Sequence, residues 1–132
     1  MADVPEPTVR VTRYEVTCLP EDLSDAWAGN FTVTVEYRGD GLWSVSQAEH
    51  RKLGADGTWS WGYRWQGGNR EPVTDEERDD YERGREEWLA AHRFDEETAL
   101  RLAREAAPLL KIRDFTVADA LAEAVAEADR ER

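Results

Sequence analysis

The sequence predicts an α+β protein in which an antiparallel sheet of about four to five strands, an N-terminal meander, packs against two to three C-terminal helices. Residues 8–65 contain short runs of alternating apolar and polar residues, separated by glycine and aspartate turns, which is typical of strands. Residues 74–128 instead combine helix-capping sequences with apolar residues at helical spacing. At 132 residues the chain is expected to form a single domain, 1–132.

The first strands follow from regular alternation. A strand is expected at residues 8–18, followed by a loop at 19–30. Residues 31–38 alternate most cleanly, so every second side chain should point into the core. The sequence Gly-Asp-Gly at 39–41 predicts a tight hairpin turn, and residues 42–47 should form the partner strand.

The last strand of the meander, expected at residues 58–65, carries aromatic residues at alternate positions. A turn at 54–57 precedes it, and residues 48–53 are expected to continue the strand before that turn. Alternate side chains share one face of a strand, which would also leave Arg64 on the opposite face. The shared face would hold Trp59, Trp61, Tyr63 and Trp65.

Such an aromatic face needs a cover, because monomeric soluble proteins rarely expose large apolar patches. The alanine-rich inner faces of the second and third helices would fit against large aromatic side chains, which favours a place in the core. The alternative is a partly exposed aromatic surface used for binding or dimerisation.

Three helices are expected after a linker at residues 66–73. The sequence TDEE at 74–77 fits a capping box, and the first helix should run to about His92. Its apolar stripe is thin, so we expect it to be only partly docked. Asp95 should cap the second helix, and Pro108 should end it.

The end of the chain should add a short strand near 109–113 and the third helix. Thr116 and Asp119 mark the start of that helix. Its buried face is expected to consist of Val117, Leu121, Ala124 and Val125. Residues 1–7 are expected to be flexible, and residues 129–132 should form a frayed tail.

The formal net charge of −12 is concentrated in the second half of the chain. Residues 1–70 carry 10 acidic and 7 basic side chains (−3), and residues 71–132 carry 19 and 10 (−9). Residues 71–87 contain nine acidic residues and three arginines, a net charge of −6. Such a surface repels phosphate backbones, so no direct nucleic-acid binding is expected, and another protein is the expected partner. The acidic candidates for an interaction surface are Asp75, Glu76, Asp79 and Asp80, which join the four aromatics and Arg64.

No catalytic, cofactor or metal site is indicated. Cys18 is the only cysteine, expected as a small buried residue on a strand, and the two histidines stand at positions 50 and 92, too far apart for a ligand motif. No segment resembles a membrane span or a signal peptide, and the single cysteine is compatible with a reducing cytoplasm. We therefore expect a cytoplasmic protein that is a monomer or weak homodimer; the sequence leaves an enzymatic role open but favours a non-enzymatic one.

A polar cluster at the junction of the first two helices is the remaining candidate. It consists of Trp88, His92, Arg93 and Asp95. His92 follows Trp88 by four residues and shares its helical face, while Arg93 and Asp95 could pair across the turn. The cluster could be a helix-corner network or could line a ligand pocket beside the aromatic strand.

Several stretches resemble a group of small uncharacterised proteins of streptomycetes and related actinobacteria, their phages and mobile elements. They are YEVTCLPED (14–22), FTVTVEYRGDGLWSV (31–45), LGADGTWSW (53–61), EEWLAAHRFDEETALRLAREAAP (86–108) and TVADALAEA (116–124). The stretch KIRDFT (111–116) departs from the more usual glycine turn. The resemblance implies a source and a globular fold, and it carries no activity, ligand or catalytic residue.

Three functions remain open. The first is a non-enzymatic protein-interaction or accessory module that uses the acidic helix and the aromatic face. The second is a small-molecule binder with an aromatic pocket. The third is an acidic mimic of nucleic acid, encoded by a phage or mobile element, which would need carboxylates spread over a broad face.

Overall fold

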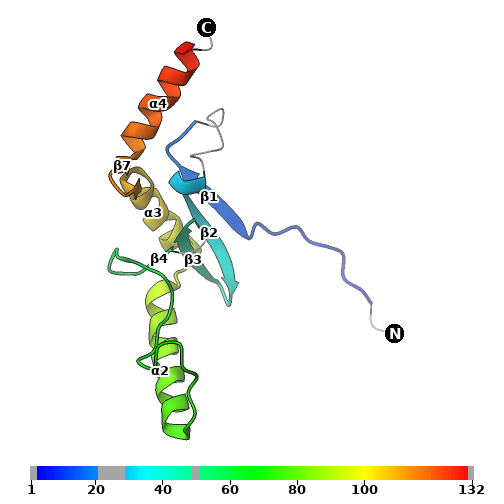
Figure 1. Ribbon diagram of the computed structural model, residues 1–132. Helices are drawn as coiled ribbons and strands as arrows, with labels where there is room; N and C mark the ends of the chain where they lie inside the picture. The colour runs from blue at the N-terminus through cyan, green and yellow to red at the C-terminus, as the bar shows by residue number, and fades with distance from the viewer. Residues whose placement is uncertain (1–2, 21–28, 49–50, 131–132) are drawn as a thin grey trace.

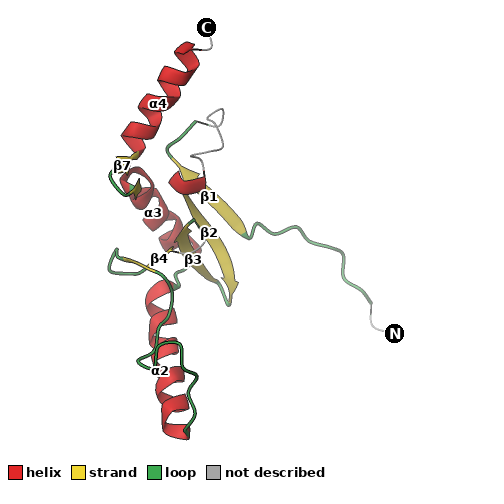
Figure 2. Cartoon of the chain, viewed as in Figure 1, coloured by secondary structure: helices red, strands yellow, loops and turns green. Residues whose placement is uncertain are grey.

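The computed structural model describes residues 3–20, 29–48 and 51–130 and has the expected α+β architecture (Figures 1 and 2). One antiparallel sheet follows chain order: β1 (Arg13–Thr17), β2 (Thr32–Gly39), β3 (Leu42–Gln47), β4 (Arg51–Leu53) and β5 (Trp59–Ser60). In the described ranges the helices are α2 (Asp75–His92), α3 (Glu96–Ala106) and α4 (Val117–Arg130), with short 3₁₀ turns η1 (Gly29–Phe31) and η2 (Ala107–Leu109). Strands β6 (Lys111–Ile112) and β7 (Phe115–Thr116) form a separate small hairpin.

The β2–β3 hairpin is the centre of the sheet, as the alternation predicted. Its turn places Gly39, Asp40 and Gly41 at positive φ, which the two glycines adopt without steric cost. The inward side chains from Phe31 to Val35 are almost completely buried, whereas Tyr37, expected in the core, is 36% exposed. The hairpin is therefore buried at its open end and partly exposed towards its turn.

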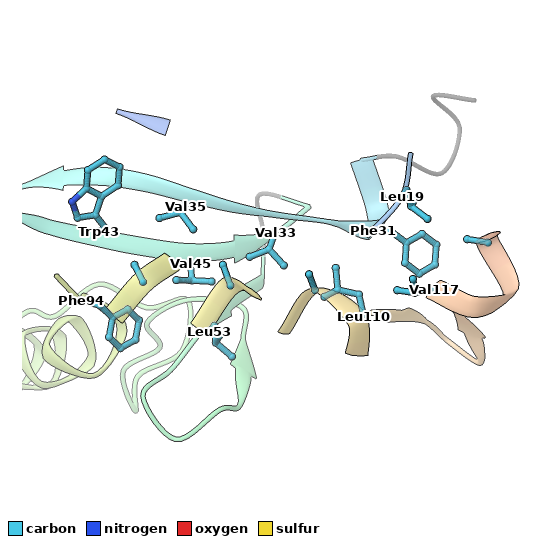
Figure 3. Close-up of a cluster of buried hydrophobic side chains, with 14 residues drawn as sticks. Leu19, Phe31, Val33, Val35, Trp43, Val45, Leu53, Phe94, Leu110 and Val117 are labelled. Carbon is cyan, nitrogen blue, oxygen red and sulfur yellow. The ribbon is translucent and has the colours of Figure 1, made fainter. Parts of the chain in front are cut away.

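The core lies between the central strands and α3 (Figure 3). Val33, Val35 and Val45 face the small side chains of Ala99 and Ala103. Each of these five residues has at most 1% of its surface exposed. Small residues let the helix approach the sheet closely, so β-branched side chains fill the space between the layers. Phe31 and Val117 extend the core at one end, as Figure 3 shows, and Trp43 and Phe94 close the other.

Phe94 fixes the corner between α2 and α3 to the sheet. Strand β4 pairs with β3 only at Ser46 and Gln47, so the edge of β3 near Trp43 needs another partner. Trp43 and Phe94 exchange two backbone hydrogen bonds, of 2.6 and 2.9 Å, and form an isolated antiparallel bridge. The chain between the two helices is thus held by the sheet itself.

The ends of the sheet differ from expectation. The strand predicted at 8–18 is shorter, since β1 begins at Arg13, and residues 3–12 are exposed without regular structure. Cys18 is exposed just after β1, which corrects its expected burial. Most of the loop expected at 19–30 lies outside the described residues. Residues 51–53 pair back onto β3 as a new strand, so the stretch 48–53 does not continue β3.

The helix starts follow the predicted caps. Thr74 Oγ1 accepts the amide of Glu77, and Asp95 accepts the amide of Thr98. Thr116 and Asp119 each accept the other's backbone amide, which completes a reciprocal capping motif at α4.

Helix α4 is only partly packed. Val117 and Ala120 are buried, but Val125, expected on the buried face, is 63% exposed because α4 extends beyond the sheet (Figure 1). The helix continues to Arg130, which places its end later than the expected tail at 129. The residues between 109 and 115 form two short strands joined by a turn and not one strand.

Candidate functional site

The most distinctive part of the molecule is an arm formed by the loop at 61–73 and α2. Figure 1 shows α2 extending away from the sheet, with this loop running along it. None of the 18 residues of α2 is buried, which fits its predicted thin apolar stripe. The arm therefore contributes little to the core, and its own contacts must hold the loop on the helix.

Tyr63 and Trp65 attach the loop to the helix at Tyr81. Both rings meet the Tyr81 ring edge to face, with centroids 5.4 and 6.0 Å apart. The hydroxyl of Tyr63 donates a hydrogen bond of 3.0 Å to the carbonyl oxygen of Tyr81. Burial, together with the nearby Tyr81 and carboxylates, raises the pKa of Tyr63, which keeps this hydroxyl protonated.

Two glycines make this packing possible. A Cβ atom at Gly84 would lie 2.4 Å from the Tyr63 hydroxyl, and one at Gly67 would lie 2.1 Å from Cζ2 of Trp65. Gly84 is unfavourable in the middle of a helix by about 1 kcal/mol relative to alanine, so close packing is a physical reason for its presence. The Gly84 contact joins the helix to the loop, and the Gly67 contact lies within the loop.

An ion pair between Arg70 and Glu77 joins the loop to the first turn of α2. Arg70 lies 2.6 Å from Glu77 Oε2, its guanidinium also covers the Trp65 ring at 5.3 Å, and the Trp65 indole donates to the Arg70 carbonyl. Glu77 Oε2 is buried and makes no well-directed hydrogen bond, so the contact is chiefly electrostatic. Arg70 holds the pKa of Glu77 below its usual range, with help from Thr74.

Two hollows flank the loop segment Tyr63–Trp65. The larger, of about 980 Å³, opens between residues 68–72 of the loop and Tyr81 on the helix. The smaller, of about 480 Å³, is lined by Trp88 and His92 further along α2. Arg64 borders both hollows and is exposed, but it lies in the loop and not on the polar face of a strand.

The predicted four-residue aromatic face does not exist as a strand face. Strand β5 ends at Ser60, and Gly62, at φ 115°, turns the chain away from the sheet. Only Trp59 packs against the core, where the Arg51 guanidinium covers its ring. The prediction that the second and third helices cover all four aromatic side chains is therefore wrong. Trp61 is instead 70% exposed, the most exposed tryptophan among the described residues.

The acidic candidates on α2 divide into two groups. Asp75 and Asp80 form ion pairs with Arg78 and Arg83, each three residues further along the helix. Glu76 and Asp79 are exposed and take part in none of the ion pairs among described residues. The same holds for Glu71, Glu82, Glu86 and Glu87. The arm thus presents six exposed carboxylates that are not neutralised within the described chain.

The predicted polar cluster at the helix junction separates into three places. The His92 ring stacks on Trp88 with centroids 4.0 Å apart, and Nδ1 donates to the Trp88 carbonyl at 2.7 Å. Because a carbonyl only accepts, Nδ1 carries a proton, and Nε2 faces Ser60 Oγ at 3.4 Å. His92 is half-buried and borders the smaller hollow.

Arg93 and Asp95 do not join that network. Asp95 caps α3, and the hydrogen bonds from Thr98 lower its pKa. Arg93 lies on another side of the corner, beside Arg38 and Arg85. The ion pair expected between Arg93 and Asp95 is absent from the described contacts.

Within residues 3–20, 29–48 and 51–130, no His, Cys, Asp and Glu side chains gather in a group that could hold a metal ion. No described helix combines the length and the apolar character that crossing a bilayer requires. No family model, curated protein or solved structure matches the chain.

Proposed function

We propose that this protein is a non-enzymatic interaction module and that the arm, residues 61–92, binds a basic segment of another protein. The observation that carries the proposal is a helix of 18 residues without one buried side chain, together with Trp61 in the preceding loop, which is 70% exposed. Neither feature contributes to the core, so neither is explained by folding alone.

The charge of the arm specifies the chemistry of the partner. The six exposed carboxylates without a described ion-pair partner, five of them on α2, outnumber Arg64 and Arg85, the exposed arginines of the arm that are in no described ion pair, and the resulting negative potential attracts a lysine- or arginine-rich surface. Trp61 adds an apolar anchor of the kind that is enriched at the centre of protein interfaces. A basic segment that also carries an apolar side chain would bind both the carboxylates of the arm and Trp61.

Affinity purification of the tagged protein at low and high salt tests the proposal, followed by titration of the purified partner against four variants. Trp61→Ala should weaken binding about tenfold or more, as expected for an interface anchor. Glu76→Lys with Asp79→Lys should weaken binding mainly at low salt, because screening already removes the electrostatic part at high salt.

Two matched substitutions away from the arm serve as controls. Leu109→Ala removes a side chain that is 74% exposed, and Glu123→Lys with Glu127→Lys reverses two charges on α4. Both controls should bind as the wild type does. Equal losses of affinity for the partner in the arm variants and in these controls would contradict a docking surface on the arm. Competition between this protein and DNA for the same partner would favour the acidic-mimic function over a general accessory role.

A small-molecule binder is the second candidate, and the hollow of about 980 Å³ favours it. Its lining combines the Tyr63, Trp65 and Tyr81 rings with polar loop residues, as in many ligand sites. A metabolite screen by thermal shift would support this function if a hit protects wild type and fails to protect Tyr81→Ala at equal fold stability.

A further inference from the structure

A third hollow, of about 420 Å³, has a charge opposite to that of the whole protein. It lies between the β2–β3 turn, the second half of α2 and the corner that follows α2. Arg38, Arg85 and Arg93 line it from these three elements, of which the β2–β3 hairpin is far from the other two in the sequence. In a chain with a formal net charge of −12, three converging guanidinium groups are the less expected arrangement.

The arginines are positioned by the fold. Arg38 Nε donates to the buried Ser44 hydroxyl at 3.1 Å, and Glu36 lies 3.4 Å from its guanidinium. Arg93 directly precedes Phe94, whose two backbone bonds to Trp43 fix the corner. A scaffold that holds its donors before a ligand arrives reduces the entropy lost on binding.

The positive charge in this hollow is only partly balanced, by Glu36 beside Arg38 and by Asp40 in the lining. Of the described ion pairs, none includes Arg85 or Arg93. Burial, followed by repulsion from Arg38 and Arg85, lowers the pKa of Arg93 despite the attraction of Glu36. An anion in the hollow would relieve this repulsion.

We propose that the hollow binds the phosphate group of a small phosphate monoester. Three guanidinium groups, the Asp40 carboxylate and the Glu36 carboxylate paired with Arg38 give the hollow a formal charge of +1, which attracts a phosphate group. Guanidinium groups form paired hydrogen bonds with phosphate oxygens, and the fork geometry of arginine suits this better than lysine does. Leu42, Leu89 and Ala90 supply an apolar wall for the organic part.

The hollow uses residues of α2 that do not line the smaller hollow of the arm. Its α2 residues Arg85 and Leu89 lie on a different helical face from Gly84 and Trp88, which border the smaller hollow of the arm. A long nucleic acid is disfavoured by the acidic surface around the hollow, so a small ligand is the fitting occupant.

Titration with phenyl phosphate, followed by amide and arginine Nε signals in NMR spectra of the full chain, tests the site. At low salt the signals of residues 38–42 and 85–93 should shift, and Arg85→Gln should weaken binding about tenfold or more. Arg93→Lys should retain part of the affinity, because it keeps the charge and loses the fork. Arg104→Gln, an exposed arginine on α3, is the matched control and should bind within about twofold of wild type.

Benzoate distinguishes phosphate from carboxylate recognition and should bind about tenfold more weakly than phenyl phosphate. Equal affinity for the two probes would overturn the assignment to phosphate monoesters. Unchanged spectra at about 10 mM phenyl phosphate, or equal affinities of Arg85→Gln and Arg104→Gln, would overturn the site itself. Wild-type-like spectra of the unliganded variants establish that any loss is not caused by unfolding.

Discussion

Gly67→Ala should reverse the usual effect of replacing glycine by alanine. At a position that tolerates a side chain, this change stabilises a protein by about 0.4–1 kcal/mol because it restricts the unfolded chain. Here the new Cβ atom would lie 2.1–2.6 Å from three atoms of the Trp65 ring. The ring is rigid and must move as a whole.

Displacement of Trp65 removes three described contacts. The indole hydrogen bond to Arg70 contributes about 0.5–1.5 kcal/mol, the edge-to-face contact with Tyr81 about 0.5–1.5 kcal/mol, and the cation–π contact about 0.5–1 kcal/mol. With the gain in the unfolded state subtracted, the net destabilisation of the arm should be about 0.5–3.5 kcal/mol.

Hydrogen exchange of the α2 amides measures this effect, because it reports opening of the arm separately from global unfolding. The same substitution is measured in a Trp65→Ala background, where the ring is absent. There Gly67→Ala should stabilise by about 0.4–1 kcal/mol, so the sign changes between the two backgrounds. Equal stabilisation in both would refute the close contact between Gly67 and Trp65.

Three other substitutions test the core, the β6–β7 turn and a helix cap. Phe31→Ala should lower the free energy of unfolding by about 3–5 kcal/mol in urea denaturation, because the side chain is completely buried against Phe115. Arg113→Gly should raise the melting temperature through a gain of about 0.5 kcal/mol, since Arg113 adopts φ 55°, where glycine is favoured. The hydrogen bonds from Thr116 lower the pKa of Asp119, so the unfolded chain binds its proton first as the pH falls. Stability from this cap should be complete above pH of about 4 and lost below it, and Asp119→Asn should flatten that part of a stability–pH profile.

The sequence predicted those elements whose signals are local. The alternation at 31–38 located β2, and the Gly-Asp-Gly turn located the hairpin, because side-chain direction and φ follow from neighbouring residues. The caps at Thr74 and Asp95 located two helix starts for the same reason. Capping depends on residues within one turn, so no tertiary information is needed.

The aromatic residues were misplaced because alternation describes a strand only where a partner strand exists. Beyond Ser60, Gly62 turns the chain, and the side chains of Tyr63 and Trp65 find Tyr81 and not the core. This contact joins residues 16 or more positions apart, so a local pattern does not contain it. The sequence did not predict the arginine hollow for a similar reason. Arg38 and Arg93 are distant in the sequence, and the bridge between Trp43 and Phe94 brings their segments together.

The separation of arm and core has a consequence for function. Stability depends mainly on the sheet and α3, where valines and alanines are completely buried, whereas α2 buries none of its residues. Charge reversals at Glu76 or Asp79 should therefore change binding with little effect on unfolding, as is typical of surface substitutions. Core substitutions such as Phe31→Ala should affect binding only through the population of folded protein.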